Sequence, residues 1–88
     1  MKAVITVVGK DRPGILAFVA GRCAAQNLNI FDVTQKVLQD LFTMIMIVQL
    51  PKDVNVSELA EDFRKAGEEQ GLQIQVMQED IFEAMHTI

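Results

Sequence analysis

The chain has 88 residues, half of them hydrophobic, and its 8 Lys and Arg against 12 Asp and Glu give a net charge of −4. This length fits one folded domain, and the acidic balance argues against nucleic acid, whose binders need a basic stripe to neutralise phosphates. The single cysteine, Cys23, excludes an internal disulfide and a cysteine-based zinc site. We therefore expect a cytoplasmic protein with no metal and no cofactor.

The N-terminal segment has a charged start and a short apolar run, but the charges of Lys10, Asp11 and Arg12 follow without a small-residue cleavage pattern. This pattern is typical of a strand and not of a signal peptide. The apolar run from Met44 to Val48 is far shorter than the ~18–20 residues of a membrane-spanning helix. We expect no membrane anchor.

Residues 3–8 form the first predicted strand. They are mostly β-branched and apolar on both alternating faces, as in a central strand that is buried on both sides, and Gly9 ends the run. Pro13 then stands where a helix favours its first residue, and a helix to about Gln26 is predicted. Its apolar stripe contains Ile15, Leu16, Val19, Ala20 and Cys23.

From Leu28 to Leu38 the pattern returns to alternation, which predicts a half-exposed strand nearer a sheet edge. One side would carry Phe31, Val33 and Val37, and the other Asp32, Thr34 and Lys36. The dipeptide Gln39-Asp40 predicts a short hairpin turn. Residues 41–48 are again apolar on both faces and predict a second central strand, in which Met44 and Met46 would fill the core.

A second helix is predicted to begin at Asn55, because Glu58 three positions later completes a capping-box-like start, and to run to about Gln70. Glu61 and Lys65 would pair on its outward face, and Gly71 would supply the left-handed residue that closes it. Leu72, Ile74 and Val76 then alternate with glutamines as a fourth strand. The tail predicts a short amphipathic helix with an apolar face of Ile81, Phe82, Met85 and Ile88.

The resulting order is βαββαβ, the ferredoxin-like arrangement of the α+β class, with two helices on one face of a four-stranded antiparallel sheet and a C-terminal helix in addition. The other face of the sheet is left open. A chain of this size buries only roughly 60–65% of its unfolded surface, so the open face and the high apolar content predict a homo-oligomer, most simply a dimer. The architecture itself hosts many functions, so the loops must indicate which one applies.

The loop after the first strand carries the motif Gly9-Lys10-Asp11-Arg12-Pro13-Gly14-Ile15-Leu16, and Asn29-Ile30 open the next strand. This resembles the ACT domain, whose pattern is a D-R-P-G-(I/L/V)-L turn and an N-I strand start. The resemblance covers residues 1–78, with residues 79–88 as an extension, and the chain is similar to free-standing bacterial ACT proteins.

The resemblance implies a non-enzymatic regulatory or sensor module that binds an amino acid between two ACT domains. Family members form this binding site from the loop after the first strand of one domain and from the start of the second strand. Here those places hold Asp11, Gly14 and Asn29, and we add Gly9, Lys10 and Arg12 as flanking candidates. Serine-binding members have an imidazole where this chain has Gly9 and an amide where it has Asp11, so the chain departs from the serine-specific pattern.

The residues of the loop support a ligand site independently of the resemblance. A helix N-terminus presents unpaired backbone N–H groups and a partial positive charge, which suit a carboxylate. Asp11 could hold an ammonium group, Gly14 allows close approach, and Asn29 both donates and accepts. The alternative is structural: Asp11 caps the helix, Pro13 fixes its first turn, and no ligand binds.

Two function classes remain open, a small-molecule sensor that passes its ligand state to another protein and an interaction or assembly module that has no ligand. An enzyme is not expected. Cys23 lies in an apolar helix stripe and the only histidine, His86, is far along the chain, so a Cys-His pair is not indicated. An acylphosphatase would need a phosphate-loop arginine and an asparagine on the third strand, where this chain has Thr43 and Gln49 among apolar residues.

Overall fold

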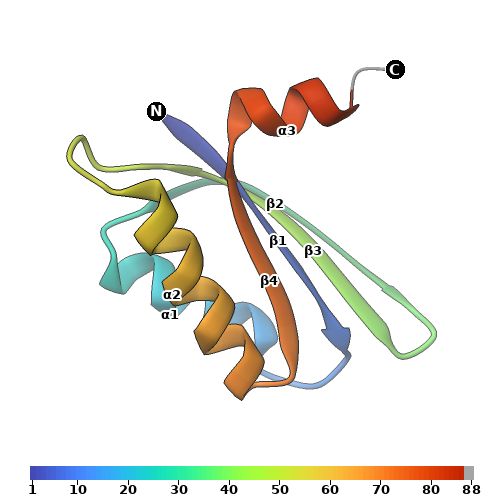
Figure 1. Cartoon of the computed structure of the whole chain (residues 1–88). Helices are drawn as coiled ribbons and strands as arrows, with labels where there is room; N and C mark the ends of the chain where they lie inside the picture. Colours follow the sequence, from blue (N-terminus) through green and yellow to red (C-terminus); the bar gives the residue numbers. More distant parts are fainter. Residues whose placement is uncertain (87–88) are drawn as a thin grey trace.

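The computed structural model describes residues 1–86 and has the predicted ferredoxin-like α+β fold with a C-terminal helix (Figure 1). Helices α1 and α2 lie together on one side of the sheet, and α3 follows β4 directly. Among the described residues, every helix is too short or too polar to cross a lipid bilayer. In chain order the elements are β1 (Lys2–Lys10), α1 (Ile15–Ala25), β2 (Asn29–Leu38), β3 (Leu41–Gln49), α2 (Val56–Glu69), β4 (Leu72–Gln78) and α3 (Glu79–His86).

The strand order is β2-β3-β1-β4 and every neighbouring pair is antiparallel, so β1 and β3 are central, as predicted, and β2 and β4 are the edges. Gln49 of β3 lies opposite both Lys2 and Asn29, the first residues of β1 and β2. Leu41, at the other end of β3, lies opposite Lys10. The start of β2 and the loop after β1 are therefore at opposite ends of the sheet.

The core lies between the sheet and the helices α1 and α2. Alternate residues of β1, β3 and β4 face it, which satisfies the period-2 pattern of the sequence. Met44 and Met46 are buried within it, which confirms the prediction that they fill the core. The buried members from the helices are Ile15, Val19, Cys23, Leu59 and Phe63.

The opposite face of the sheet carries exposed apolar side chains, as the sequence predicted. Val8, Leu38, Leu41 and Ile45 are each between 38% and 54% exposed. Val4 is on this face and is buried, in a region where α3 contacts β1 and β4. Of the predicted apolar face of α3, Ile88 and the side chain of Met85 lie outside the described residues.

The predicted alternation along β2 is wrong at its start, because a β-bulge lies between Ile30 and Asp32. The bulge puts Ile30 and Val33 against the core, whereas the Phe31 ring is half-exposed and lies 4.8 Å from Lys2 Nζ. An inserted residue shifts the side-chain period by one position, and the sequence alternation alone does not reveal it.

The second helix begins as predicted. The Asn55 side chain accepts a hydrogen bond from the Glu58 N–H at 3.1 Å, and Gly71 has a left-handed φ of 71° just after the helix. The predicted Glu61–Lys65 pair is not the one that forms, because Glu61 binds the Arg64 guanidinium instead. The planar guanidinium meets both oxygens of a carboxylate with two parallel hydrogen bonds, a geometry that an ammonium group does not offer.

Gly67 is the point of closest approach between α2 and β4. A Cβ atom at this position would lie 2.7 Å from Ile74 Cγ1 and 2.9 Å from the Leu72 carbonyl oxygen. The second of these atoms belongs to the backbone and cannot rotate away. Glycine is therefore required here by packing, although it lowers the helix propensity of α2.

We predict that Gly67→Ala lowers the free energy of unfolding by about 1–3 kcal/mol, because the methyl group overpacks the contact with β4. Gly21→Ala on α1 is the matched control, since a Cβ there has no atom within 4 Å. It should raise the stability by about 0.5–1 kcal/mol through helix propensity alone. Urea denaturation of both variants measures the effects, and equal stabilisation by both would contradict this account of the α2–β4 contact.

Candidate functional site

The N-terminus of α1 is capped by Gly14 and not by a side chain. Gly14 has a left-handed φ of 90°, and its carbonyl oxygen accepts the first helical hydrogen bond from the Phe18 N–H at 2.9 Å. The helix begins at Ile15, so the prediction that Pro13 is its first residue is wrong. The alternative role of Asp11 as the helix cap is also wrong, because no side chain caps α1. The backbone N–H groups in the first turn of α1 have no helical carbonyl partner, because no turn of helix comes before them.

Asp11 is joined to the β2–β3 turn through its backbone. Its N–H donates to the Asp40 carbonyl oxygen at 2.7 Å, and its side chain is exposed. Lys10, the last residue of β1, is also exposed. The predicted ligand loop is thus held at the hairpin end of the sheet with its charged side chains open to solvent.

Arg12 joins the same loop to the end of α2. Its guanidinium donates to the Gln70 carbonyl oxygen at 3.1 Å and to Gln70 Oε1 at 3.0 Å. A cation is favoured there because the helix C-terminus carries a partial negative charge and unpaired carbonyl groups. The structure therefore gives this candidate ligand residue a bracing role.

Gly9 has a packing role of its own. An added Cβ would lie 2.6 Å from Leu72 Cδ2 and 3.2 Å from the Gly71 carbonyl oxygen. The close approach of β1 to the start of β4 favours a residue without a side chain. Of the flanking candidates, Gly9 and Arg12 thus have structural reasons to be present.

Asn29 is not brought together with Asp11 and Gly14 within one chain. It lies beside the Lys2 end of β1, whereas the loop follows Lys10. Eight residue steps at roughly 3.3 Å each separate these ends by about 26 Å. A site that uses both the loop and Asn29 therefore needs two copies of the chain.

Cys23 is fully buried on α1, as the sequence predicted. Its burial raises the pKa of the thiol to about 11, because the thiolate would lose its hydration. Among the side chains that the structure describes, no three from His, Cys, Asp or Glu lie close enough to hold a metal ion together.

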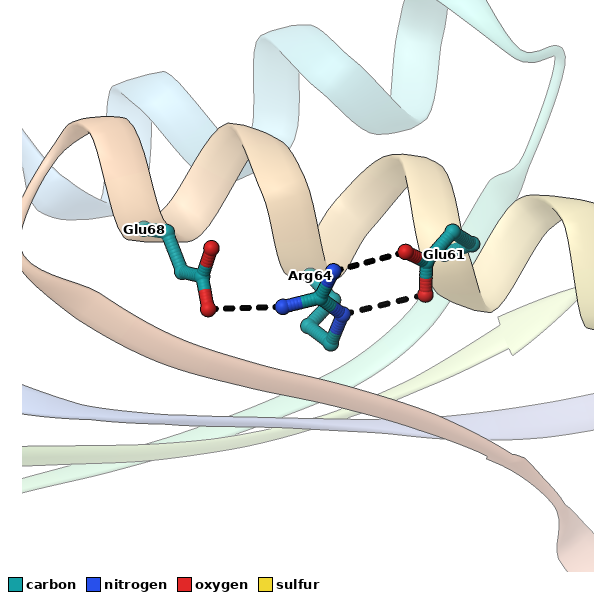
Figure 2. Close-up of polar contacts among 3 residues, drawn as sticks. All are labelled: Glu61, Arg64 and Glu68. Atoms are coloured by element: carbon teal, nitrogen blue, oxygen red, sulfur yellow. Dashed lines mark hydrogen bonds and ion pairs between the residues drawn. The ribbon is translucent and has the colours of Figure 1, made fainter.

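A groove of about 640 Å³ runs between α2 and β4. Figure 2 shows three of its side chains on the flank of α2, with Arg64 between Glu61 and Glu68. The Arg64 guanidinium lies 2.6 Å from a carboxylate oxygen of each, which lowers the pKa of Glu61 and raises that of Arg64. The groove is lined by Ser57, Ala60, Glu61, Arg64, Glu68 and the β4 residues from Leu72 to Met77.

Sequence patterns alone did not predict this groove. Two sequence features could have indicated it: polar residues at helical spacing, followed by a strand without charges. The polar residues are Ser57, Glu61, Arg64 and Glu68. Those residues form a groove only because α2 packs against the edge strand, which is a tertiary contact.

The comparisons with known proteins agree with the fold. The family model for the ACT domain matches residues 2–77. A UPF0237 protein of Methanopyrus kandleri is 49% identical over 88 residues, covering 99% of this chain and 98% of the relative. The solved structure of an ACT domain protein from Streptococcus pneumoniae has 42% identity and a TM-score of 0.86, with 98% of each chain covered.

A fourth similarity is to a larger protein, assigned as a glycine cleavage system transcriptional repressor. Its structure matches with 26% identity and a TM-score of 0.76, covering 86% of this chain and 44% of that one.

We predict that Cys23 resists thiol reagents in the native protein and that its titration destabilises the fold at high pH. A pKa raised from 9.0 to about 11 keeps the folded thiol neutral while the unfolded thiol ionises. The contribution of Cys23 to the free energy of unfolding is therefore complete below pH 9. It is lost as the pH rises from 9 to 11, which lowers the free energy of unfolding by roughly 2–3 kcal/mol. Cys23→Ala removes this component, and identical pH profiles for the two proteins would contradict the prediction.

Proposed function

Because the chain belongs to the ACT domain family, we propose that it is a non-enzymatic regulatory module that binds an amino acid or a similar small zwitterion as a homodimer. The observation that carries this proposal is the open N-terminus of α1, which has a glycine cap with no side chain and lies in an exposed loop. The likeness to a protein assigned as a transcriptional repressor supports a regulatory role.

The chemistry of the loop suits a zwitterion. The N–H groups of the first turn of α1 would hold the carboxylate, and the first turn contains no acidic residue to repel it. Asp11 would hold the ammonium group, since its carboxylate has no part in capping the helix. Gly14 would let the ligand reach the backbone closely.

The proposed dimer supplies the missing half of the site. β2 is an edge strand and α1 contacts it, so two copies related by a two-fold axis beside β2 would lie antiparallel. This arrangement would bring Asn29 of the partner subunit toward the loop. Exposed apolar side chains on α1 and β2 support contact along this flank, namely Leu16, Phe31 and Val37.

In this proposal residues 1–78 form the ligand-binding unit, and residues 79–88 are an extension of it. The protein would act in the cytoplasm and pass its ligand state to another protein. An assembly module without a ligand would also form the dimer but would not respond to a ligand. Measurements of dimerisation and of ligand binding therefore distinguish the two functions.

We predict that sedimentation at micromolar concentration gives a mass of roughly twice the 9.8 kDa of the chain. The reason is that neither the exposed apolar flank nor the split site is complete in one copy. A species of 9.8 kDa alone would contradict the dimer and, with it, a site shared between subunits.

We predict that the cognate amino acid raises the free energy of unfolding by about 2.7 kcal/mol at a hundred times its dissociation constant. A thermal melt against the common amino acids and related metabolites at millimolar concentration measures this effect. Asp11→Ala and Asn29→Ala should each abolish the gain, and Lys65→Ala on α2 should retain it. Without ligand, Asp11→Ala should change stability by less than about 0.5 kcal/mol, because the backbone of Asp11 makes its hydrogen bond.

Mixing the two inactive variants tests the shared site directly. A heterodimer of Asp11→Ala with Asn29→Ala contains one site with both natural residues, so the mixture should recover about one quarter of the binding capacity. Recovery of none would show that both residues act from one chain or that neither binds ligand. Absence of any ligand shift in the wild-type protein would favour the assembly module.

A further inference from the structure

The face of the sheet that points away from α1 and α2 carries a helix at one end and is open at the other. Helix α3 contacts β1 and β4, and Val4 on this face is only 1% exposed. Figure 1 shows α3 at the far end of β4, away from the β2–β3 hairpin. Toward the hairpin, Val8, Leu38, Leu41 and Ile45 are each at least 38% exposed. We call these four residues the hairpin patch.

The strand register makes the hairpin patch one continuous surface. Leu38 lies opposite Leu41, and Val8 lies opposite Thr43, which is two residues from Ile45 and points to the same face. The patch extends roughly 13 Å along β3, from Ile45 to Leu41, at about 3.3 Å per residue. It spans β2, β3 and β1, which is roughly 10 Å at about 4.8 Å per strand spacing. These dimensions suit an α-helix of two to three turns, whose diameter is about 10 Å.

The charged side chains at the hairpin patch are basic. By the strand register, Lys10 and Lys36 point to the same face as the patch, and both are exposed. Asp32 also points to this face but lies past the end of the patch, and Asp11 and Asp40 are in the loop and the turn beyond the strands. The patch is thus a basic area on a chain whose net charge is −4. Charge complementarity at such a surface favours an acidic partner.

Helix α3 shows which kind of segment this face of the sheet already holds. Its first turn contains Glu79 and Asp80, and Glu83 follows. Its apolar residues include Ile81 and Phe82. A short, acidic, amphipathic helix therefore contacts the sheet at one end of this face. A second helix of the same chemistry fits the apolar surface and the two lysines at the other end.

We propose that the hairpin patch docks an amphipathic helix of another protein, two to three turns long, with acidic side chains on both flanks of its apolar stripe. The stripe packs on Val8, Leu41 and Ile45, and the carboxylates face Lys10 and Lys36. Because Lys10 is the last residue of β1, the docked helix lies beside the ligand loop. The dimer proposed along β2 leaves this face open, and docking does not require the amino-acid ligand.

The test uses the full chain and two blocked peptides of about twelve residues, enough for three helical turns. Both have leucines at helical spacing in an alanine background, and the leucines are flanked by glutamates in one peptide and by lysines in the other. The glutamate peptide should shift the methyl NMR signals of Val8, Leu41 and Ile45. It should bind at least about tenfold more tightly than the lysine peptide. The methyl signals of Leu16, which is exposed on α1, should not change.

Two kinds of variant test the apolar and the charged parts of the surface separately. Ile45→Thr removes apolar contact but keeps a β-branched side chain that suits a strand, and it should weaken binding of the glutamate peptide about tenfold. Lys10→Gln/Lys36→Gln should also weaken it about tenfold. Lys65→Gln on α2 is the matched control, on the other side of the sheet, and should change the affinity less than about twofold.

Equal binding of the two peptides, no binding at millimolar concentration, or methyl shifts confined to residues outside the hairpin patch would overturn the proposal. Shifts of Val8 and Ile45 that depend on protein concentration without peptide would also overturn it, because they would assign the patch to a second copy of the chain.

Discussion

The central strand β1 is the constraint on which the rest of the structure depends. It is paired with β3 on one side and β4 on the other, in continuous antiparallel register. Its odd residues direct their hydrogen bonds to β3 and its even residues to β4, so the backbones of both neighbouring strands are fixed relative to the core. Together with the pairing of β2 and β3, this register sets the distance between Asn29 and the loop.

The loop after β1 is held in place by its neighbours and not by a helix cap. The Asp11 N–H bonds the β2–β3 turn, and the Arg12 guanidinium bonds the end of α2. With the loop held at both sides, Gly14 can adopt its left-handed conformation and leave the first turn of α1 without a side-chain partner. Preorganisation of this kind lowers the ordering cost of binding a small ligand.

Helix α2 supports the proposed ligand loop and also packs closely against β4. Its end accepts the hydrogen bonds of Arg12, and its flank forms the wall of the groove beside β4. Close packing at Gly67 places that flank against the edge strand. The salt bridges of Arg64 are exposed and add little to stability.

The sequence by itself determined the fold, because its local signals agreed with one another. These signals were the period-2 and helical patterns, the Asn55 cap and Gly71. It also indicated the loop motif and the burial of Cys23 and the core methionines. Only the tertiary structure decided the bulge at Phe31, the cap at Gly14, and the choice of Arg64 over Lys65 as the partner of Glu61. It alone placed Asn29 and Asp11 at opposite ends of the sheet and formed the groove beside β4. These features depend on strand register and on contacts between residues far apart in the chain, which local side-chain patterns do not encode.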